Sequence, residues 1–161
     1  MPMTFDIAPA TPNDVDTILG FIRELADYEH ALDAVEASAA DLHAALFCDN
    51  PRVSSDICRI DGRAVGFVLY FFSFSTWVGR QSLFLEDLYV TPAHRGQGAG
   101  KALFRHLAQV AIDNNCGRFE WNVLDWNRPA IDFYESFGAQ SQSEWVGYRL
   151  TGEALAALAR S

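Results

Sequence analysis

The apolar residues of this chain recur at two spacings, every second residue in some stretches and every third or fourth residue in others. The first spacing predicts strands and the second predicts amphipathic helices. Strands are expected over residues 3–9, 55–60, 63–74, 82–90, 118–124 and 144–150, and helices over residues 11–29, 38–47, 98–111, 127–138 and 151–160. The first helix is expected to take Thr11 as its N-cap, with Pro12 and Asp14 in its first turn.

The order of these elements predicts an α/β fold built on a mixed sheet. The turn pair Asp61-Gly62 joins the first two of three consecutive strands over residues 55–90, which indicates an antiparallel meander. The strand at 82–90, the helix at 98–111 and the strand at 118–124 imply a parallel pair with a crossover helix. Because no linker, repeat or low-complexity segment interrupts the pattern, a single domain over residues 1–161 is expected.

Composition narrows the class of partner. The net charge of −9 disfavours nucleic acid and would attract a cationic substrate, although an acidic surface also serves solubility. The three cysteines, Cys48, Cys58 and Cys116, are too widely spaced to suggest a disulfide framework or a zinc site, so no metal is expected. The chain has no export signal and no apolar run of about 20 residues, so we expect a cytoplasmic protein without membrane contact.

The segment AHRGQGAGKALF, residues 93–104, places three glycines before a helix, an arrangement that binds anions. The nucleoside-triphosphate loop GxxxxGK followed by Ser or Thr does not fit, because Arg95 and Ala102 occupy its first glycine and its hydroxyl position. The dinucleotide pattern GxGxxG fits at Gly96 and Gly98 but has Lys101 in place of its third glycine. Lys101 weakens the dinucleotide alternative. It stays open here because Glu120 lies at the distance of a ribose-binding acid.

The segment also matches RxxGxG through Arg95, Gly98 and Gly100. A second pattern follows about 30 residues later; it consists of Asn127, Ala130, Phe133, Tyr134 and Gly138. Together these residues resemble the two signatures of the GNAT superfamily of acyl-CoA N-acyltransferases. The segments ELADYE, LEDLYV, DWNRPAIDFYESFGA and the stretch from Trp77 to Gly79 are similar to its diamine (spermidine/spermine, thialysine) acetyltransferase branch, from about Phe5 to Leu150.

The resemblance implies a GNAT fold in which the two parallel strands splay apart and acetyl-CoA binds as co-substrate. The pantetheine arm is expected along the backbone of Leu88, Tyr89 and Val90. The pyrophosphate is expected at Arg95, Gly96, Gln97, Gly98, Ala99, Gly100 and Lys101, where backbone N–H groups and a helix N-terminus favour an anion. The next helix is expected to contribute Asn127, Arg128, Ala130, Phe133 and Tyr134.

Transfer of an acetyl group to an amine needs a base, because an aliphatic amine has a pKa near 10, and a proton for the leaving thiolate. The resemblance implies Glu86 as general base, acting through a water, and Tyr134 as general acid. Glu86 could instead only bind the cationic substrate, and Tyr134 could be a core aromatic beside Phe133. Regular strand alternation places Asp87 on the face opposite Glu86, so a paired dyad is not expected.

The acceptor is expected to be the primary amine of a polyamine, thialysine or similar small cation. Its candidate contacts are Tyr28, Glu29, Trp77, Glu86, Asp87, Glu120, Trp121, Asn122 and Glu144. Two acids of the diamine branch are replaced here by Ser75 and Val146, and Glu144 could compensate for the second. The branch is dimeric, so a homodimer is expected. A non-catalytic acyl-CoA-binding sensor and a transferase acting on a protein or peptide amine are the alternatives.

Overall fold

The computed structural model describes residues 3–161, and its contacts group the chain into two compact units. Met1 and Pro2, which belong to the predicted domain of residues 1–161, lie outside the described residues. The first unit, Met1–Asn122, contains β1 (Asp6–Pro9), α1 (Val15–Tyr28), α2 (Ala39–Leu46), β2 (Ser54–Ile60), β3 (Arg63–Ser75), β4 (Arg80–Val90), α3 (Ala99–Asp113) and β5 (Arg118–Trp121). The second unit, Val123–Ser161, contains α4 (Arg128–Glu135) and α5 (Gly152–Arg160). A single domain over the whole chain stays a prediction.

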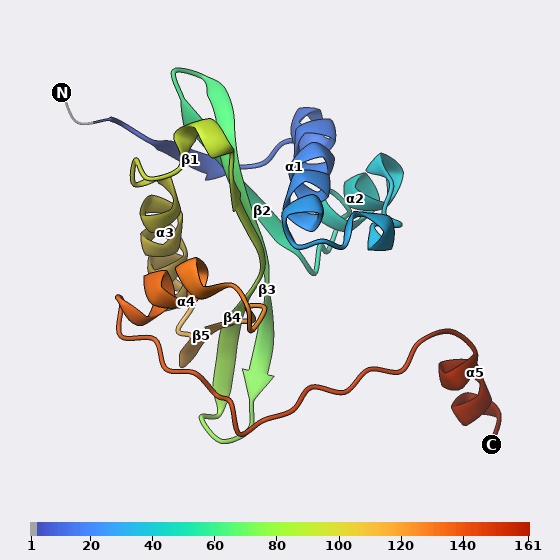
Figure 1. Ribbon diagram of the computed structural model, residues 1–161. Helices are drawn as coiled ribbons and strands as arrows, with labels where there is room; N and C mark the ends of the chain where they lie inside the picture. The colour runs from blue at the N-terminus through green and yellow to red at the C-terminus, as the bar shows by residue number, and fades with distance from the viewer. Residues whose placement is uncertain (1–2) are drawn as a thin grey trace. The chain divides into compact units, whose positions relative to one another are not determined.

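The five strands form one mixed sheet in the order β1-β2-β3-β4-β5. The first four strands pair antiparallel and β5 pairs parallel with β4, which confirms both the meander and the parallel pair. Helices α1 and α2 cover one face of the sheet, and α3, the crossover between β4 and β5, lies on the other face (Figure 1).

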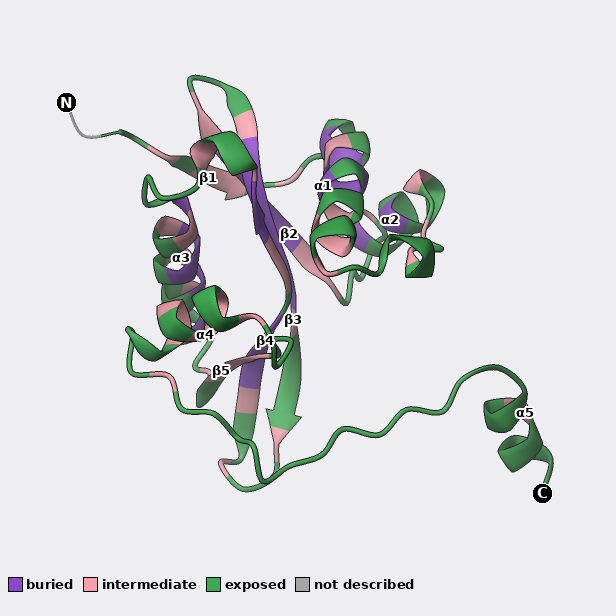
Figure 2. Ribbon diagram, in the orientation of Figure 1, coloured by how far each residue is buried: buried purple, intermediate pink, exposed green. Residues whose placement is uncertain are grey.

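The core lies on both faces of the sheet. Ile18 of α1, Ile57 of β2 and Phe67 of β3 are fully buried, and the Phe21 ring stacks on Phe67 with centroids 5.7 Å apart. Leu103 and Leu107 of α3 are fully buried on the opposite face. Buried residues are therefore concentrated along the central strands and on the inward sides of α1 and α3 (Figure 2). This burial on both faces holds β4 in place between the helices.

The predicted N-cap Thr11 is found on the 3-10 turn that precedes α1, whereas α1 itself begins at Val15 with Asp14 as its N-cap. The backbone N–H of Thr11 donates to the Asp14 carboxylate at 2.8 Å, and Pro12 begins a single 3-10 turn, Pro12–Asp14, that leads into α1. The start of the second helix has the same bond, because the backbone N–H of Ser38 donates to the Asp41 carboxylate at 2.8 Å, and in addition Ser38 Oγ accepts from the backbone N–H of Asp41 at 3.2 Å. Local capping groups thus set where both helices begin.

The predicted strand at residues 144–150 is wrong. Within the described residues this segment pairs with no strand, and its side chains are exposed, with Tyr148 95 % accessible. Trp145, Val146 and Tyr148 favour a strand by composition, but a strand also needs a hydrogen-bonding neighbour. The parallel strand predicted at 118–124 is present but ends at Trp121. Among residues 3–161, no helix is long and apolar enough to cross a membrane.

Candidate active site

The parallel strands β4 and β5 pair over only four residues each. Their pairing runs from Ser82 with Arg118 to Leu85 with Trp121, and β4 then continues alone on this side to Val90. The two strands therefore separate after Leu85, so Glu86 is the first residue of β4 beyond the paired segment. This separation agrees with the splay that the resemblance implies and leaves Leu88, Tyr89 and Val90 beyond the paired segment.

A β-bulge lies at the point of separation. On the other side of β4, Leu85 pairs with Tyr70 and Asp87 pairs with Leu69, so Glu86 is the extra residue opposite β3. A bulge interrupts the regular alternation of side chains. The expectation that Glu86 and Asp87 act separately on opposite faces therefore does not hold here, because it assumed unbroken alternation.

The charges of two nearby carboxylates act on Asp87 at this bulge. Burial raises the pKa of Asp87 to about 6, and the charges of Glu86 and Glu29 add to the increase. Burial also raises the pKa of Glu29, which follows the last residue of α1. A carboxyl group whose pKa lies near 6 can both hold a cation and exchange a proton close to neutral pH. The bulge thus carries an aspartate with this property, Asp87, directly beside Glu86.

The glycine segment forms the entry to α3. Gly96 and Gly98 adopt positive φ values of 73° and 98°, and Gly98 is the N-cap of the helix, a residue that has no side chain to cap the first N–H groups. Positive φ favours glycine strongly, so the two residues are needed for this path of the backbone. An uncapped helix start with its partial positive charge fits a phosphate. Lys101 lies in the first turn of α3 and is exposed.

Arg95 is held by the protein itself. Its Nε donates to the carbonyl of Val90 at 2.9 Å, and its Cζ lies 5.4 Å from the ring centroid of Tyr28 and 5.4 Å from that of Tyr89. Burial raises the pKa of Tyr89, Glu24 adds to this effect, and Arg95 opposes it. The Arg95 side chain, at the start of the glycine segment, therefore contacts both the end of β4 and the end of α1.

The other acceptor candidates of the first unit are dispersed. Trp77 lies in the turn between β3 and β4 and is 79 % exposed. The Trp121 ring packs on Phe104 of α3 with centroids 5.0 Å apart, whereas Glu29 and Asp87 interact on the side of α1. Glu120 forms an ion pair with Arg118 at 3.9 Å. The structure therefore gathers Glu29, Glu86 and Asp87 but not Trp121; for Asn122 an acceptor role stays a prediction.

The remaining candidates belong to the second unit. Asn127 is the N-cap of α4 and accepts from the backbone N–H of Ala130, and Arg128 pairs with Asp132 at 2.7 Å. Tyr134 lies on the same helix, its ring centroid 5.9 Å from that of Phe133. Glu144 lies in the segment that is not a strand. Their roles toward coenzyme and acceptor stay predictions.

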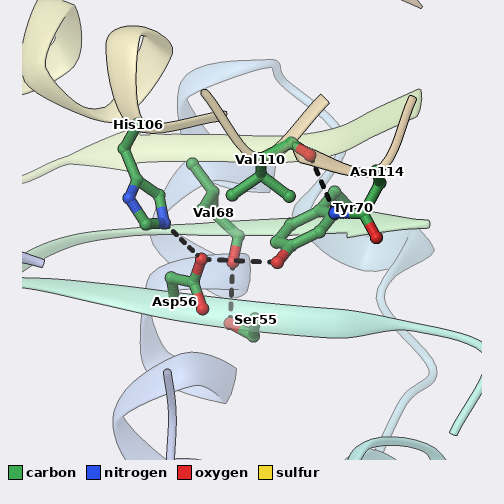
Figure 3. A network of polar contacts seen from close by, with 7 residues as sticks. All are labelled: Ser55, Asp56, Val68, Tyr70, His106, Val110 and Asn114. Carbon is green, nitrogen blue, oxygen red and sulfur yellow. Dashed lines mark hydrogen bonds and ion pairs between the residues drawn. The ribbon is translucent and has the colours of Figure 1, made fainter. Parts of the chain in front are cut away.

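A buried polar network was not expected from the sequence. The Asp56 carboxylate of β2 lies 2.7 Å from Nε2 of His106 on α3 and accepts from the Tyr70 hydroxyl of β3 at 3.4 Å (Figure 3). Burial and the nearby Asp56 charge raise the pKa of Tyr70 to about 12. The only local sign was an aspartate inside an expected strand. Among residues 3–161, no three His, Cys, Asp or Glu side chains gather as metal ligands.

Known proteins match both the sequence and the fold. Residues 16–139 match the model of the acetyltransferase (GNAT) family. Thialysine N-epsilon-acetyltransferase of Sus scrofa is 41 % identical over 95 % of this chain and 96 % of its own length. Spermidine/spermine N(1)-acetyltransferase-like protein 1 of Homo sapiens is 38 % identical over 91 % of this chain, but the match covers 22 % of that protein.

A solved structure agrees with these relatives. An integron cassette protein from the mobile metagenome of V. cholerae superposes with a TM-score of 0.80 at 32 % identity and covers 99 % of both chains. The family match covers well over half of the chain, and the thialysine acetyltransferase relative aligns along nearly its whole length. The glycine segment, the separated parallel strands and these likenesses lead to one conclusion: the chain belongs to the acetyltransferase (GNAT) family and is an N-acetyltransferase.

Proposed function

We propose that this N-acetyltransferase moves the acetyl group of acetyl-CoA to a primary amine of a small polycationic acceptor, such as thialysine or a polyamine. The observation that carries the proposal is the cluster of Glu29, Glu86 and Asp87 at the β4 bulge, where like charges help to raise the pKa of Asp87 to about 6. Such a cluster is destabilised by its own negative charge. A bound ammonium group relieves that repulsion, so cationic amines are favoured over neutral ones.

The coenzyme assignment rests on the glycine segment. GNAT acetyltransferases use acetyl-CoA as co-substrate. Gly96 and Gly98 keep side chains away from the uncapped start of α3, and Lys101 supplies a full positive charge beside it. In this assignment the pyrophosphate binds at residues 95–101, and the pantetheine arm follows Leu88, Tyr89 and Val90, beyond the point where β5 leaves β4.

The transfer needs one new bond, one broken bond and three proton movements. The Glu86 and Asp87 carboxylates hold the ammonium, and Glu86, acting through a water, takes its first proton. The neutral amine nitrogen then attacks the thioester carbonyl, so a C–N bond forms and the C–S bond breaks. Tyr134 gives a proton to the leaving sulfur, and the nitrogen gives up its second proton as the amide forms, which balances the proton that Tyr134 supplied. We further propose that the protein acts in the cytoplasm as a homodimer.

The test is release of free CoA from acetyl-CoA with a panel of acceptors. The panel contains thialysine, spermidine, lysine, a peptide N-terminus and the matched pair 1,5-diaminopentane and pentylamine, which differ by one ammonium group. We expect turnover of the dications and a KM for the diamine below that for the monoamine. Binding of acetyl-CoA without turnover of any acceptor would favour the sensor alternative, and turnover of the peptide alone would favour a peptide transferase.

A matched pair of variants tests the acidic cluster directly. Glu29→Gln removes one of the three charges, so it should raise the KM of the diamine by about threefold to tenfold and leave that of the monoamine less affected. Glu36→Gln removes an exposed carboxylate from the loop before α2 and should change neither value. Equal effects of Glu29→Gln on both amines would contradict recognition of a second positive charge.

A further inference from the structure

Arg95 belongs by position to the coenzyme segment, but its side chain is engaged elsewhere. Its Nε donates to the Val90 carbonyl at 2.9 Å, and its guanidinium carbon lies over the ring of Tyr28 and over the ring of Tyr89, 5.4 Å from each centroid. Stacking on two aromatic faces favours a planar guanidinium over a lysine ammonium. The side chain is therefore fixed against the sheet and α1.

The two tyrosines that Arg95 contacts lie close in sequence to the acidic cluster of Glu29, Glu86 and Asp87. Tyr28 is the last residue of α1 and directly precedes Glu29. Tyr89 lies two residues beyond Asp87 on β4, and its ring is 5.6 Å from that of Phe21 on α1. Glu29 and Asp87 in turn interact through their charges. A displacement of Arg95 thus acts on the amine side of the site through Tyr28, which is bonded to Glu29, and through Tyr89, which lies two residues from Asp87 on the same strand.

We propose that Arg95 is a positioning residue that couples the coenzyme segment to the acceptor cluster. Binding of the coenzyme orders residues 95–101, which fixes Arg95 against Tyr28 and Tyr89 and so fixes the end of α1 with Glu29. The phosphate charge is met by backbone N–H groups and Lys101, not primarily by Arg95. Coupling of this kind is reciprocal, so a bound amine also strengthens coenzyme binding. This inference rests on the proposed function, because it assumes coenzyme A at residues 95–101.

Hydrogen exchange at the end of α1 tests the coupling without any amine. The backbone N–H groups of Glu29, His30 and Ala31 are hydrogen-bonded to the last turn of α1. Coenzyme A should slow their exchange by about fivefold or more in the wild-type protein. Arg95→Lys, which keeps the charge but loses the Nε donor and the planar stack, should abolish most of this slowing.

Three further variants distinguish a positioning role of Arg95 from an effect of its charge and from a loss of folding. Tyr28→Leu should abolish the slowing, and Tyr28→Phe, which keeps the ring, should restore it. Lys101→Gln should weaken coenzyme A binding but keep the full slowing once the protein is saturated. Thermal melts of each variant verify that it is folded.

Steady-state kinetics provide an independent measure. Arg95→Lys and Tyr28→Leu should each raise the KM of the amine, and the double variant should be no worse than either, since both act on one contact. Full slowing in Arg95→Lys, or coenzyme A binding to the wild type with no change at α1, would overturn this inference alone. Failure of the wild type to bind coenzyme A would instead refute the proposed function.

Discussion

Replacement of Asp87 by asparagine should stabilise the protein at neutral pH while lowering its activity. The native pKa of Asp87 is about 6, against an ordinary value of 3.8. The native state therefore binds a proton that the unfolded chain has already released between these two pH values. Ionisation of Asp87 lowers the free energy of unfolding progressively from about pH 4 to about pH 6, and the full loss is present at pH 7.

The size of the effect follows from the shift. A difference of about two pKa units corresponds to about 3 kcal/mol, and this is an upper bound because Asp87 is only partly buried. Asp87→Asn stays neutral, so its free energy of unfolding should exceed that of the wild type by about 1 to 3 kcal/mol at pH 7 and match it near pH 4. Stability gained by removing an active-site charge commonly reduces function.

Urea denaturation of the wild type and the variant, at several values between about pH 4 and pH 7, measures this difference. Asp49→Asn, an exposed site after α2, is the control and should show no pH-dependent difference. In a Glu29→Gln background the advantage of Asp87→Asn should shrink, because one source of the raised pKa is gone. An advantage that persists unchanged at pH 4 would refute the reasoning, since ionisation could not be its cause.

Three other predictions concern the network, the glycine segment and the acid. Asp56→Ala should lower the free energy of unfolding, measured by urea denaturation, by about 2 to 3 kcal/mol, because Tyr70 and His106 lose their common partner. Asp56→Asn should cost about 1 kcal/mol, and a loss under about 0.5 kcal/mol for the alanine variant would contradict this prediction. Gly98→Ala should lower the free energy of unfolding by about 1 to 2 kcal/mol, because φ is 98° at this position, and it should weaken acetyl-CoA binding in a calorimetric titration. An affinity equal to that of the wild type would count against the phosphate site. Tyr134→Phe should lower kcat about 100-fold with little change in acetyl-CoA affinity, and an unchanged kcat would remove Tyr134 from the acid role.

Local signals made the element pattern predictable. Thr11, Pro12 and Asp14 identify the start of the first helix, and Asp61-Gly62 identifies the hairpin between β2 and β3. These features depend on groups within a few residues of one another, and such groups can be recognised in a sequence. The glycine spacing and the second signature likewise predicted the family, which the matches confirm.

Features that depend on distant partners were not predictable in this way. Asp56 and His106 lie 50 residues apart, and nothing local to either residue indicates the other. The bulge at Glu86 depends on how β4 pairs with β3, and its sequence alone reads as a regular strand. The segment at 144–150 has strand composition but, within residues 3–161, no strand beside it. Pairing is a tertiary property that composition cannot supply.

The single extra residue at Glu86 divides β4 into two segments that can vary independently. Before the bulge, Leu83 and Leu85 are constrained by the packed interior of the sheet. After it, Asp87 and Tyr89 face α1, in the opposite phase of alternation. Deletion of Glu86 would therefore not merely shorten the strand; it would exchange the faces of everything that follows. Under the proposed function, substitution at Asp87 changes acceptor preference without altering the interior that Leu83 and Leu85 build before the bulge, provided that the length of this strand is conserved.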